Sequence, residues 1–481
     1  MKQKVTIESF HAWFPWVGLL AITVIRFLFL ESNDVAMDEP FTVFNAQADL
    51  HTLFGIFPTE NNPPLYFLLM HFWVMVFGIS PFAIRFLSCI FSILTAVMLY
   101  KTGKTFFSRQ VGFFAAAIFT LSDYHQLFAH EARVYALFGL LTVTSMYLFL
   151  SLSSGKGRWK YMLLLSLVNV LLIYAHFFGF FIFLIQGLSS FFIGEYRRTT
   201  LKWFAGAAAL SLIAYIPYFP ILFSRFFQSA GQGTWVQPPV ISDLYTMVWR
   251  YLNAPVVTVM VLCILAGAAV IYVLRRVKGT VHASPANIAV IVWFTVPYLL
   301  MFLVSYRIPM FLDRYTVFIS VGFYLLVAIA LSSMVRQVKP LIIVMAVFLA
   351  IMAVTFHPKV YNKRRLKEAV SYISANQGPG TSVIVSPSWL SLGFAYHHNQ
   401  RMFKDYQNLP LLLNKESVFP ANKLKDLDTN KLGESDRVLL FEEWLSLTDP
   451  GQTTINYLNR KFRHERTTSF YQNFNVHEYK K

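Results

Sequence analysis

Residues 340–356 read PLIIVMAVFLAIMAVTF, a run of seventeen residues without a charged side chain. A helix of this length and composition can cross most of the ~30 Å hydrocarbon core of a membrane, because each residue adds ~1.5 Å. Arg336 and Lys339 precede the run, and a charged segment follows it from His357 onward. We therefore predict that it is a transmembrane helix, and the last one in the chain.

Similar runs recur along the chain, which is 56% hydrophobic and 14% charged, with a mean hydropathy of +0.51. Soluble domains usually carry about 25% charged residues, so a soluble globule and a disordered chain are both excluded. The runs predict an α-helical polytopic membrane protein with about eleven transmembrane helices. The predicted spans are 13–30, 82–100, 111–122, 134–153, 161–175, 177–193, 203–223, 253–274, 287–304, 315–333 and 340–356.

The distribution of Lys and Arg gives the predicted orientation. With a cytoplasmic N-terminus, sixteen basic residues fall on the inner side, and only Arg133, Arg225, Arg307 and Arg314 fall in outer loops. This positive-inside bias accounts for much of the net charge of +17, so we expect no nucleic-acid partner. The bias would collapse if the run 63–78 also spanned, so that run is predicted to be an outer interfacial helix. The inner residues are Lys2, Lys4, Lys101, Lys104, Arg109, Lys156, Arg158, Lys160, Arg197, Arg198, Lys202, Arg275, Arg276, Lys278, Arg336 and Lys339.

The ends of the chain differ in character. We predict an uncleaved first span within 1–30, because no A-x-A site follows its apolar stretch. The absence of an N-x-[ST] sequon fits a bacterial source, so the inner (plasma) membrane is the expected location. The predicted organisation is a transmembrane domain over 1–356, which contains the first outer loop 31–81, and a soluble extracytoplasmic α/β domain over 357–481. In the latter, a helix is predicted at Lys363–Asn376, with strands at Thr381–Ser386 and Asp436–Phe441 and a third within Phe470–Tyr479.

The first outer loop is acidic and contains no Lys or Arg between residues 31 and 62. Membrane topology alone explains such a loop, since cations are excluded from the outer side. The pair Asp38 and Glu39 is more specific, because Pro40 and an apolar–polar helical pattern up to Leu53 follow it. These carboxylates are predicted to lie at a helix N-terminus, where the helix dipole stabilises them. At a partly dehydrated interface, such a carboxylate can act as a general base.

Two outer boundaries carry arginines that suit a phosphate ligand. Arg133 follows Glu131, and Arg314 lies between Asp313 and Tyr315. Arginine stays charged, and its planar fork matches phosphate oxygens. The alternative is that both arginines snorkel to the interface or pair with their acidic neighbours. Together with the acidic pair on the same face, they favour a lipid-linked phosphate as leaving group and a carboxylate that deprotonates an acceptor.

Other polar residues are weaker candidates. Arg26 and Arg85 lie within predicted spans, near their outer ends, where they either snorkel or reach a lipid phosphate. His176 lies at an outer turn and forms a weak candidate metal pair with Glu60, although a lone boundary histidine is more often structural. The sequence requires no cofactor and leaves a divalent metal open.

Several of these segments together resemble one family of membrane enzymes. They are MDEP at 37–40, NPPLYFLL at 62–69, GISPFAIRFLS at 78–88, EARVYAL at 131–137 and DRY at 313–315. In order, spacing and predicted sidedness, they are similar to membrane glycosyltransferases of the protein O-mannosyltransferase (dolichyl-phosphate-mannose-protein mannosyltransferase-like) and lipid A aminoarabinose transferase type. The resemblance covers roughly residues 1–335, and it implies the GT-C fold with its interfacial helices.

The resemblance also implies a reaction, which is inverting transfer of a sugar from a polyprenyl-phosphate donor to an acceptor hydroxyl on the outer face. Asp38 is then the catalytic base, and Glu39 supports it. Arg85, Arg133 and Arg314 are then the ligands of the donor phosphate. Supporting roles in the donor and acceptor site are then expected for Tyr66, Glu131, Tyr135, Asp313 and Tyr315 of these motifs, and for Glu60 just before the second motif.

The chain departs from these relatives in ways that leave its acceptor open between lipid, glycan and protein. The first outer loop has no Asp-x-Asp, so the metal-bound mode of oligosaccharyltransferases is not implied. Asn61 or Asn62 stands where aminoarabinose transferases place a lysine. Only about 30 residues separate the spans 203–223 and 253–274, where eukaryotic protein mannosyltransferases carry a long insertion.

Two other functions explain part of the pattern. A transporter or flippase of a lipid-linked or anionic substrate accounts for intramembrane arginines, but it predicts internal repeats that the sequence lacks. A polyprenyl-dependent polysaccharide polymerase or ligase usually relies on a large late loop, whereas the acidic loop here is the first. A transporter can be distinguished from a glycosyltransferase by the product, because a transporter releases no free polyprenyl phosphate.

Overall fold

The computed structural model describes residues 7–155, 158–192, 197–232, 236–279, 284–335, 337–362, 364–471 and 474–481. Lys2, Lys4, Lys156, Arg336 and Lys363, on which parts of the sequence predictions rest, lie outside these residues. Contacts divide the chain into two compact units. We call them the membrane unit (1–29, 56–66 and 85–360) and the loop–tail unit (30–55, 67–84 and 361–481), and each is described by itself.

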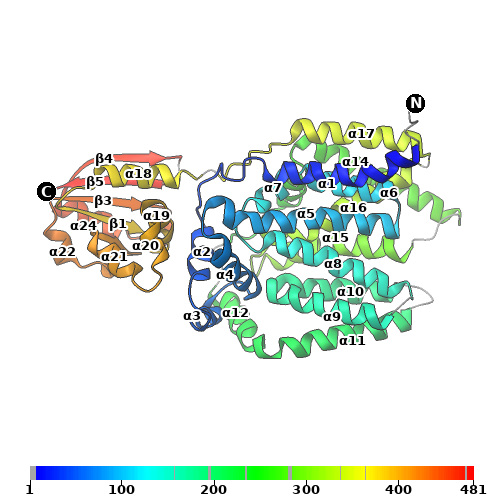
Figure 1. Cartoon of the computed structure of the whole chain (residues 1–481), viewed down its shortest axis with the longest axis horizontal. Helices are drawn as coiled ribbons and strands as arrows, with labels where there is room; N and C mark the ends of the chain where they lie inside the picture. The colour runs from blue at the N-terminus through cyan, green and yellow to red at the C-terminus, as the bar shows by residue number, and fades with distance from the viewer. Residues whose placement is uncertain are drawn as a thin grey trace, which may run out of the picture. The chain divides into compact units, whose positions relative to one another are not determined.

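The membrane unit is built from long apolar helices, which contact one another side by side (Figure 1). In the described part of the chain, eight helices are long and apolar enough to cross a membrane, which confirms the polytopic helical class. They are α5 (Pro81–Phe106), α8 (Tyr135–Ser153), α9 (Arg158–Ala175), the stretch Arg198–Gln228, α14 (Pro255–Val277), α15 (Pro285–Val304), α16 (Val317–Met334) and α17 (Val338–Thr355). The stretch Arg198–Gln228 covers most of α11 (Arg197–Tyr215), η4 (Ile216–Tyr218) and α12 (Phe219–Gln232).

Three other predicted spans also form helices. These are α1 (Ile7–Phe27), α6 (Arg109–Thr120) and α10 (Phe180–Phe191). Helices α6 and α10 have 12 residues each. At ~1.5 Å per residue each is ~18 Å long, so neither alone matches the hydrocarbon thickness. The remaining helical elements of this unit are η1 (Phe57–Thr59), α7 (Asp123–Ala129), η2 (Phe177–Gly179), α13 (Asp243–Tyr251) and η5 (Asp313–Tyr315).

Some buried polar side chains of the membrane unit bond to one another between helices. A closed ring of hydrogen bonds joins α8, α9 and α10: Ser145 donates to Asn169 (2.5 Å), Asn169 to Gln186 (3.1 Å) and Gln186 to Ser145 (2.7 Å). All three side chains are buried. Where no water is available, such pairing is the alternative to an unsatisfied polar group in hydrocarbon.

Helices α5 and α6 approach closely because glycines face each other. A Cβ atom added to Gly103 would lie 2.3 Å from the Cα of Gly112, and one added to Gly112 would lie 2.4 Å from the carbonyl oxygen of Tyr100. These distances are far below van der Waals contact with rigid backbone atoms. Only hydrogen fits at either position, as is common where membrane helices pack backbone to backbone.

Replacing Gly112 by Ala is therefore expected to push α6 away from α5 and to destabilise the membrane unit by about 1–3 kcal/mol. The measurement is the thermal unfolding midpoint of the detergent-purified protein. Gly18→Ala is the matched control, because a Cβ atom at Gly18 meets nothing within 4 Å. Equal midpoints for the two variants would contradict the close packing.

The loop–tail unit contains a five-stranded sheet in the order β2-β1-β3-β5-β4. Strand β1 (Thr381–Ser386) pairs in parallel with β2 (Val418–Pro420) and β3 (Arg437–Glu442), whereas β5 (Phe474–Lys480) is antiparallel to β3 and to β4 (Arg463–Phe470). The small α/β domain is confirmed, with β1 at its predicted bounds. The segment predicted as one strand within 470–479 is instead the end of one strand and most of the next, because a hairpin turns after Phe470.

Helices cover both faces of this sheet. On one face, Ile384, Val438 and Leu440 form a core with Leu458 of α24 and with Phe462, which follows that helix. On the other, α18 and α19 pack against the sheet, with Phe394 and Phe441 at a ring distance of 6.5 Å. The helical elements of the tail are α18 (Leu366–Asn376), α19 (Leu390–His398), α20 (Gln400–Lys404), α21 (Leu409–Lys415), η6 (Leu424–Asp426), α22 (Thr429–Gly433), α23 (Leu445–Thr448) and α24 (Thr453–Lys461).

The first outer loop packs against the tail within the same unit. It contributes α2 (Glu39–Ala46), most of α3 (Leu50–Ile56) and most of α4 (Leu65–Phe77), so the predicted helices after Asp38 and within 63–78 are confirmed. The ring of Phe44 stacks on Tyr406 at 4.6 Å, and Tyr396 donates to the carbonyl of Ile79 at 2.8 Å. The Asp34 carboxylate accepts from the backbone N–H of Lys367 at 2.9 Å, in the first turn of α18.

Candidate active site

The acidic pair lies at the start of α2, as predicted. Asp38 is the N-cap residue and Glu39 the first helical residue, but the Asp38 side chain makes no capping hydrogen bond. Asp38 is partly exposed, whereas Glu39 is only 3% exposed. The residue before them, Met37, has a φ of 56°, which is uncommon for a residue other than Gly, Asn or Asp. Asp38 is thus partly open to solvent, and Glu39 lies inside the fold.

An arginine from the tail acts on Asp38 within the loop–tail unit. Burial lowers the pKa of Arg364, and the negative charge of Asp38 opposes that effect. Arg364 also forms an ion pair with Glu443, and these side chains are only 9% and 8% exposed. The guanidinium lies over the rings of Trp444 (5.4 Å) and Phe474 (5.8 Å). The tail therefore supplies a fixed positive charge to the neighbourhood of Asp38.

Two of the predicted phosphate ligands converge in the membrane unit. Arg133, between α7 and α8, is 7% exposed. Arg314 lies in η5, with its guanidinium 5.7 Å from the ring of Tyr315. Both arginines act on His176, since burial first and then their two charges lower its pKa to about 3. Residues that are far apart in the sequence thus build one cationic cluster around a neutral imidazole.

His176 is held firmly in this cluster. Its Nδ1 accepts a hydrogen bond of 3.1 Å from the backbone N–H of Phe178. Its ring stacks on Phe138, with 4.7 Å between centroids and 14° between planes, and it meets Tyr315 at 6.0 Å. Tyr315, which the sequence assigned a supporting role, is therefore part of the cluster.

Asp313 bonds to the backbone of Arg314, because its Oδ1 accepts from the Arg314 N–H at 2.8 Å. Its carboxylate pairs with Arg250 of α13 at 2.5 Å, an arginine that the sequence analysis overlooked. Its carbonyl accepts from the Tyr124 hydroxyl at 2.6 Å. Asp313 thus fixes the segment that carries Arg314.

Arg85 and Arg26 also belong to the membrane unit. Both are fully buried, and both lower the pKa of His130, whose main perturbation is burial. Arg26 donates to the Phe119 carbonyl (2.9 Å) and to Gln126, so its interactions are those of a structural residue. The interactions described for Arg85 place it with His130 and Arg26.

Tyr66 and Glu60 also lie in the membrane unit. The Tyr66 hydroxyl is buried and bonds to Ser88 of α5 at 2.9 Å, and Ser88 reaches the Arg133 carbonyl at 3.5 Å. Tyr66 thereby links two of the motifs through the backbone of Arg133. Glu60 and Arg225 both act electrostatically on Tyr218, and Arg225 donates to the Pro58 carbonyl at 2.9 Å.

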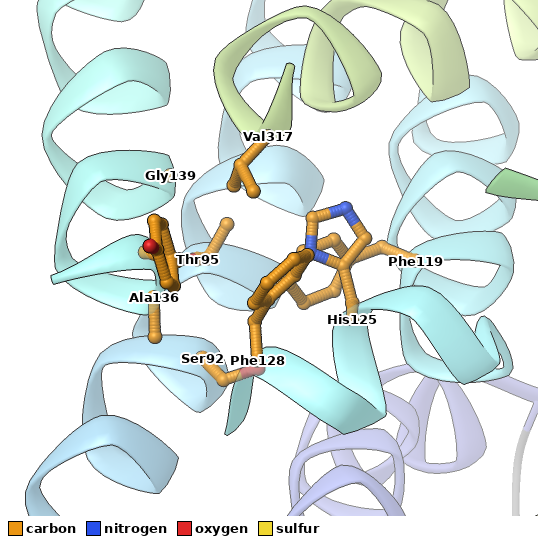
Figure 2. A pocket seen from close by; sticks show the side chains of 9 residues that line it. Ser92, Thr95, Phe119, His125, Phe128, Ala136, Gly139 and Val317 are labelled. Carbon is orange, nitrogen blue, oxygen red and sulfur yellow. The ribbon is translucent and has the colours of Figure 1, made fainter. Parts of the chain in front are cut away.

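A small cavity lies next to Tyr135 and is lined by His125 and Phe128 of α7 (Figure 2). The free volume within it is about 10 Å³, room for at most one water molecule. His125 bonds from Nε2 to Ser320 at 2.9 Å. A cavity of this size cannot admit a sugar or an isoprenoid chain, so the cavity itself is not a donor site.

The weak metal pair gains no support from the geometry. Among the described residues, no group of three or more His, Cys, Asp or Glu side chains is placed to hold a metal ion. His176 lies beside two arginines, whose charge opposes a cation, and Glu60 lies near Tyr218 and Arg225.

The comparisons with known proteins agree with this architecture. Residues 61–221 match the family model described as dolichyl-phosphate-mannose-protein mannosyltransferase. No curated protein matches the sequence. The fold is similar to that of ArnT from Cupriavidus metallidurans bound to undecaprenyl phosphate, with a TM-score of 0.61, 12% identity, and coverage of 97% of this chain and 98% of that chain.

A second solved structure shares the fold. It is the archaeal oligosaccharyltransferase AglB from Archaeoglobus fulgidus, in complex with an inhibitory peptide and a dolichol-phosphate. The TM-score is 0.54 and the identity 11%, and the match covers 97% of this chain and 74% of that chain. The chain is therefore an integral membrane protein with the GT-C fold of membrane glycosyltransferases. Its segment 61–221 is similar to the mannosyltransferase family model, and the expected fold is confirmed.

Proposed function

We propose that the protein is an inverting glycosyltransferase that moves a sugar from a polyprenyl phosphate to an acceptor hydroxyl on the outer face of the membrane. The observation that carries this proposal is the convergence of Arg133 and Arg314 on buried His176. Two positive charges held near each other favour the binding of an anion. In a unit made of membrane helices, a lipid-linked phosphate is the anion that reaches such a place.

The proposed reaction is a single displacement. The acceptor oxygen attacks C1 of the sugar, and Asp38 takes the acceptor proton as the new C–O bond forms. The bond between C1 and the phosphate oxygen breaks, and its electron pair stays on the polyprenyl phosphate. The departing phosphate gains negative charge, which Arg133 and Arg314 stabilise. Because a phosphate needs no proton to leave, one carboxylate suffices.

Arg133 and Arg314 of the membrane unit bind the lipid-linked donor, and Arg85 contributes positive charge to that unit. Asp38 belongs to the loop–tail unit, together with a tail whose Arg364 acts on it. A base must reach the acceptor hydroxyl, so the loop–tail unit is expected to bind the acceptor. The positive-inside bias supports a cytoplasmic N-terminus and an extracytoplasmic tail, in a bacterial inner membrane.

The experiment that tests this function is mass spectrometry of lipids that co-purify with the protein, supplemented by assay of free polyprenyl phosphate. A polyprenyl-phosphate sugar bound to the purified protein, and free polyprenyl phosphate released during turnover, are expected. A transporter of lipid-linked sugar would bind the same donor but release no free polyprenyl phosphate. Bulk phospholipid alone would overturn the proposal.

Replacing both Arg133 and Arg314 by Gln is expected to remove the bound donor. Each charged donor to a phosphate is worth about 10²–10³ in transition-state stabilisation, so loss of either should already slow transfer by that factor. Donor retention is measured as the molar ratio of polyprenyl-phosphate sugar to protein. Arg307→Gln is the control, because Arg307 is an exposed arginine of the same predicted face. Equal retention in both variants would refute the assignment.

A further inference from the structure

The hydrogen bonding of His176 fixes which of its nitrogens carries the proton. Nδ1 lies 3.1 Å from the backbone N of Phe178, which can only donate, so Nδ1 is the acceptor. A neutral imidazole then carries its hydrogen on Nε2. Burial and the nearby charges of Arg133 and Arg314 keep the ring neutral, since they lower its pKa to about 3. His176 is thus a fixed donor of one N–H bond.

The Nε2–H group of His176 has no acceptor among the described residues of the protein. The side chain of His176 is 4% exposed, and its Nε2 has no hydrogen-bond partner among the described residues. A buried N–H without an acceptor is rare, and it costs about 1–3 kcal/mol of stability. Such an atom beside two guanidinium groups indicates a ligand that accepts hydrogen bonds and carries negative charge.

We propose that His176 is a third ligand of the donor phosphate, to which it donates its Nε2–H beside Arg133 and Arg314. This inference rests on the proposed function and adds a residue that the motifs do not contain. The ring planes of Phe138 and Tyr315 hold the imidazole in place, so little side-chain entropy is lost when the phosphate binds.

A neutral hydrogen-bond donor such as the His176 imidazole can stabilise the transition state of this reaction selectively. The phosphate is a diester with one negative charge in the donor, and it becomes a monoester with up to two as the C1–O bond breaks. A hydrogen bond from His176 strengthens as that charge develops, without a third fixed positive charge that would also hold the product. A metal ion would need a lone pair on Nε2, but Nε2 carries the proton.

Two amide variants separate this role from a structural one. Asn at position 176 can place its carbonyl oxygen where Nδ1 lies and so keep the bond from Phe178, but it cannot reach the position of Nε2. Gln can place its amide N–H near the position of Nε2, but it does not restore the Nδ1 acceptor. The probe is undecaprenyl phosphate, titrated against the full-length protein in detergent, with inorganic phosphate as a headgroup-only comparison.

His176→Asn is expected to weaken binding of undecaprenyl phosphate about tenfold or more, since a hydrogen bond to a charged group is lost. His176→Gln should retain most of the affinity, and His51→Asn, at an exposed histidine of α3, should leave it unchanged. Loss with Gln and retention with Asn would show a purely structural role and overturn the inference. Equal binding by wild type and both variants would also overturn it, while the proposed function stands. If the wild type itself fails to bind undecaprenyl phosphate, the proposed function fails first.

Discussion

Asp38→Asn is expected to lower the rate of sugar transfer by about 10²–10⁴-fold while the donor stays bound. Asn is almost isosteric with Asp but cannot accept a proton at neutral pH. The start of α2 should survive the change, because the Asp38 side chain makes no capping hydrogen bond. The measurement is release of polyprenyl phosphate from the co-purifying donor when a cell-envelope extract supplies the acceptor.

The inactive variant should also accumulate its donor, because binding is kept and turnover is lost. Asp49→Asn is the matched control, since Asp49 is an exposed carboxylate of the same loop that bonds to Thr52. Full turnover by Asp38→Asn would remove Asp38 from the chemistry. In that case Glu39, which is buried beside it, would not replace it without a rearrangement of α2.

The parts of the fold that sequence could predict are those set by local pattern. Strand β1 follows Gly-Pro-Gly and is a continuous buried run, so its bounds match the prediction. The helix after Asp38 begins where an acidic pair and Pro40 indicate a helix start. Strand β2 was missed because it has only three residues, and it forms only by pairing with β1.

The candidate site was predictable as a set of residue types, but not as an arrangement. The motifs gave Asp38, Arg133 and Arg314, because acidic and basic side chains stand out in an apolar sequence. His176 was noticed as a lone boundary histidine, yet its role depends on a backbone bond from Phe178 that no residue pattern encodes. The partner of Asp313 is Arg250, on a helix 63 positions away in the sequence.

Arg364 lay in a tail to which the sequence analysis assigned no chemistry. Its importance comes from tertiary packing, because the first outer loop and the tail form one compact unit. Asn362 donates to the carbonyl of Asp34 at 3.0 Å, and His397 bonds to the carbonyl of Val35 at 2.9 Å. The tail is thus bonded to the segment just before Asp38, which explains how a distant arginine reaches it.

Arg364→Met is accordingly expected to destabilise the loop–tail unit by about 3–5 kcal/mol, because the Glu443 carboxylate then stays buried without its cation. Glu443→Leu should cost a similar amount. Hydrogen exchange of β1 and α18 in the full-length protein measures this local stability. The double variant removes both charges and is expected to regain most of the loss, since apolar replacement of a buried pair is often neutral.

The rate of sugar transfer should respond differently from stability when Arg364 and Glu443 are replaced singly and together. If Arg364 also acts on Asp38, the folded double variant still transfers sugar more slowly than the wild type, and its stability does not explain this loss of rate. The positive charge of Arg364 favours the carboxylate form of Asp38, so its removal should move the acidic limb of the pH–rate profile to higher pH. Glu39, adjacent to Asp38, and Glu443, paired with Arg364, carry the opposing charges, and removal of Glu443 alone should move the limb the other way. A double variant that recovers both stability and the wild-type profile would make Arg364 a structural residue only.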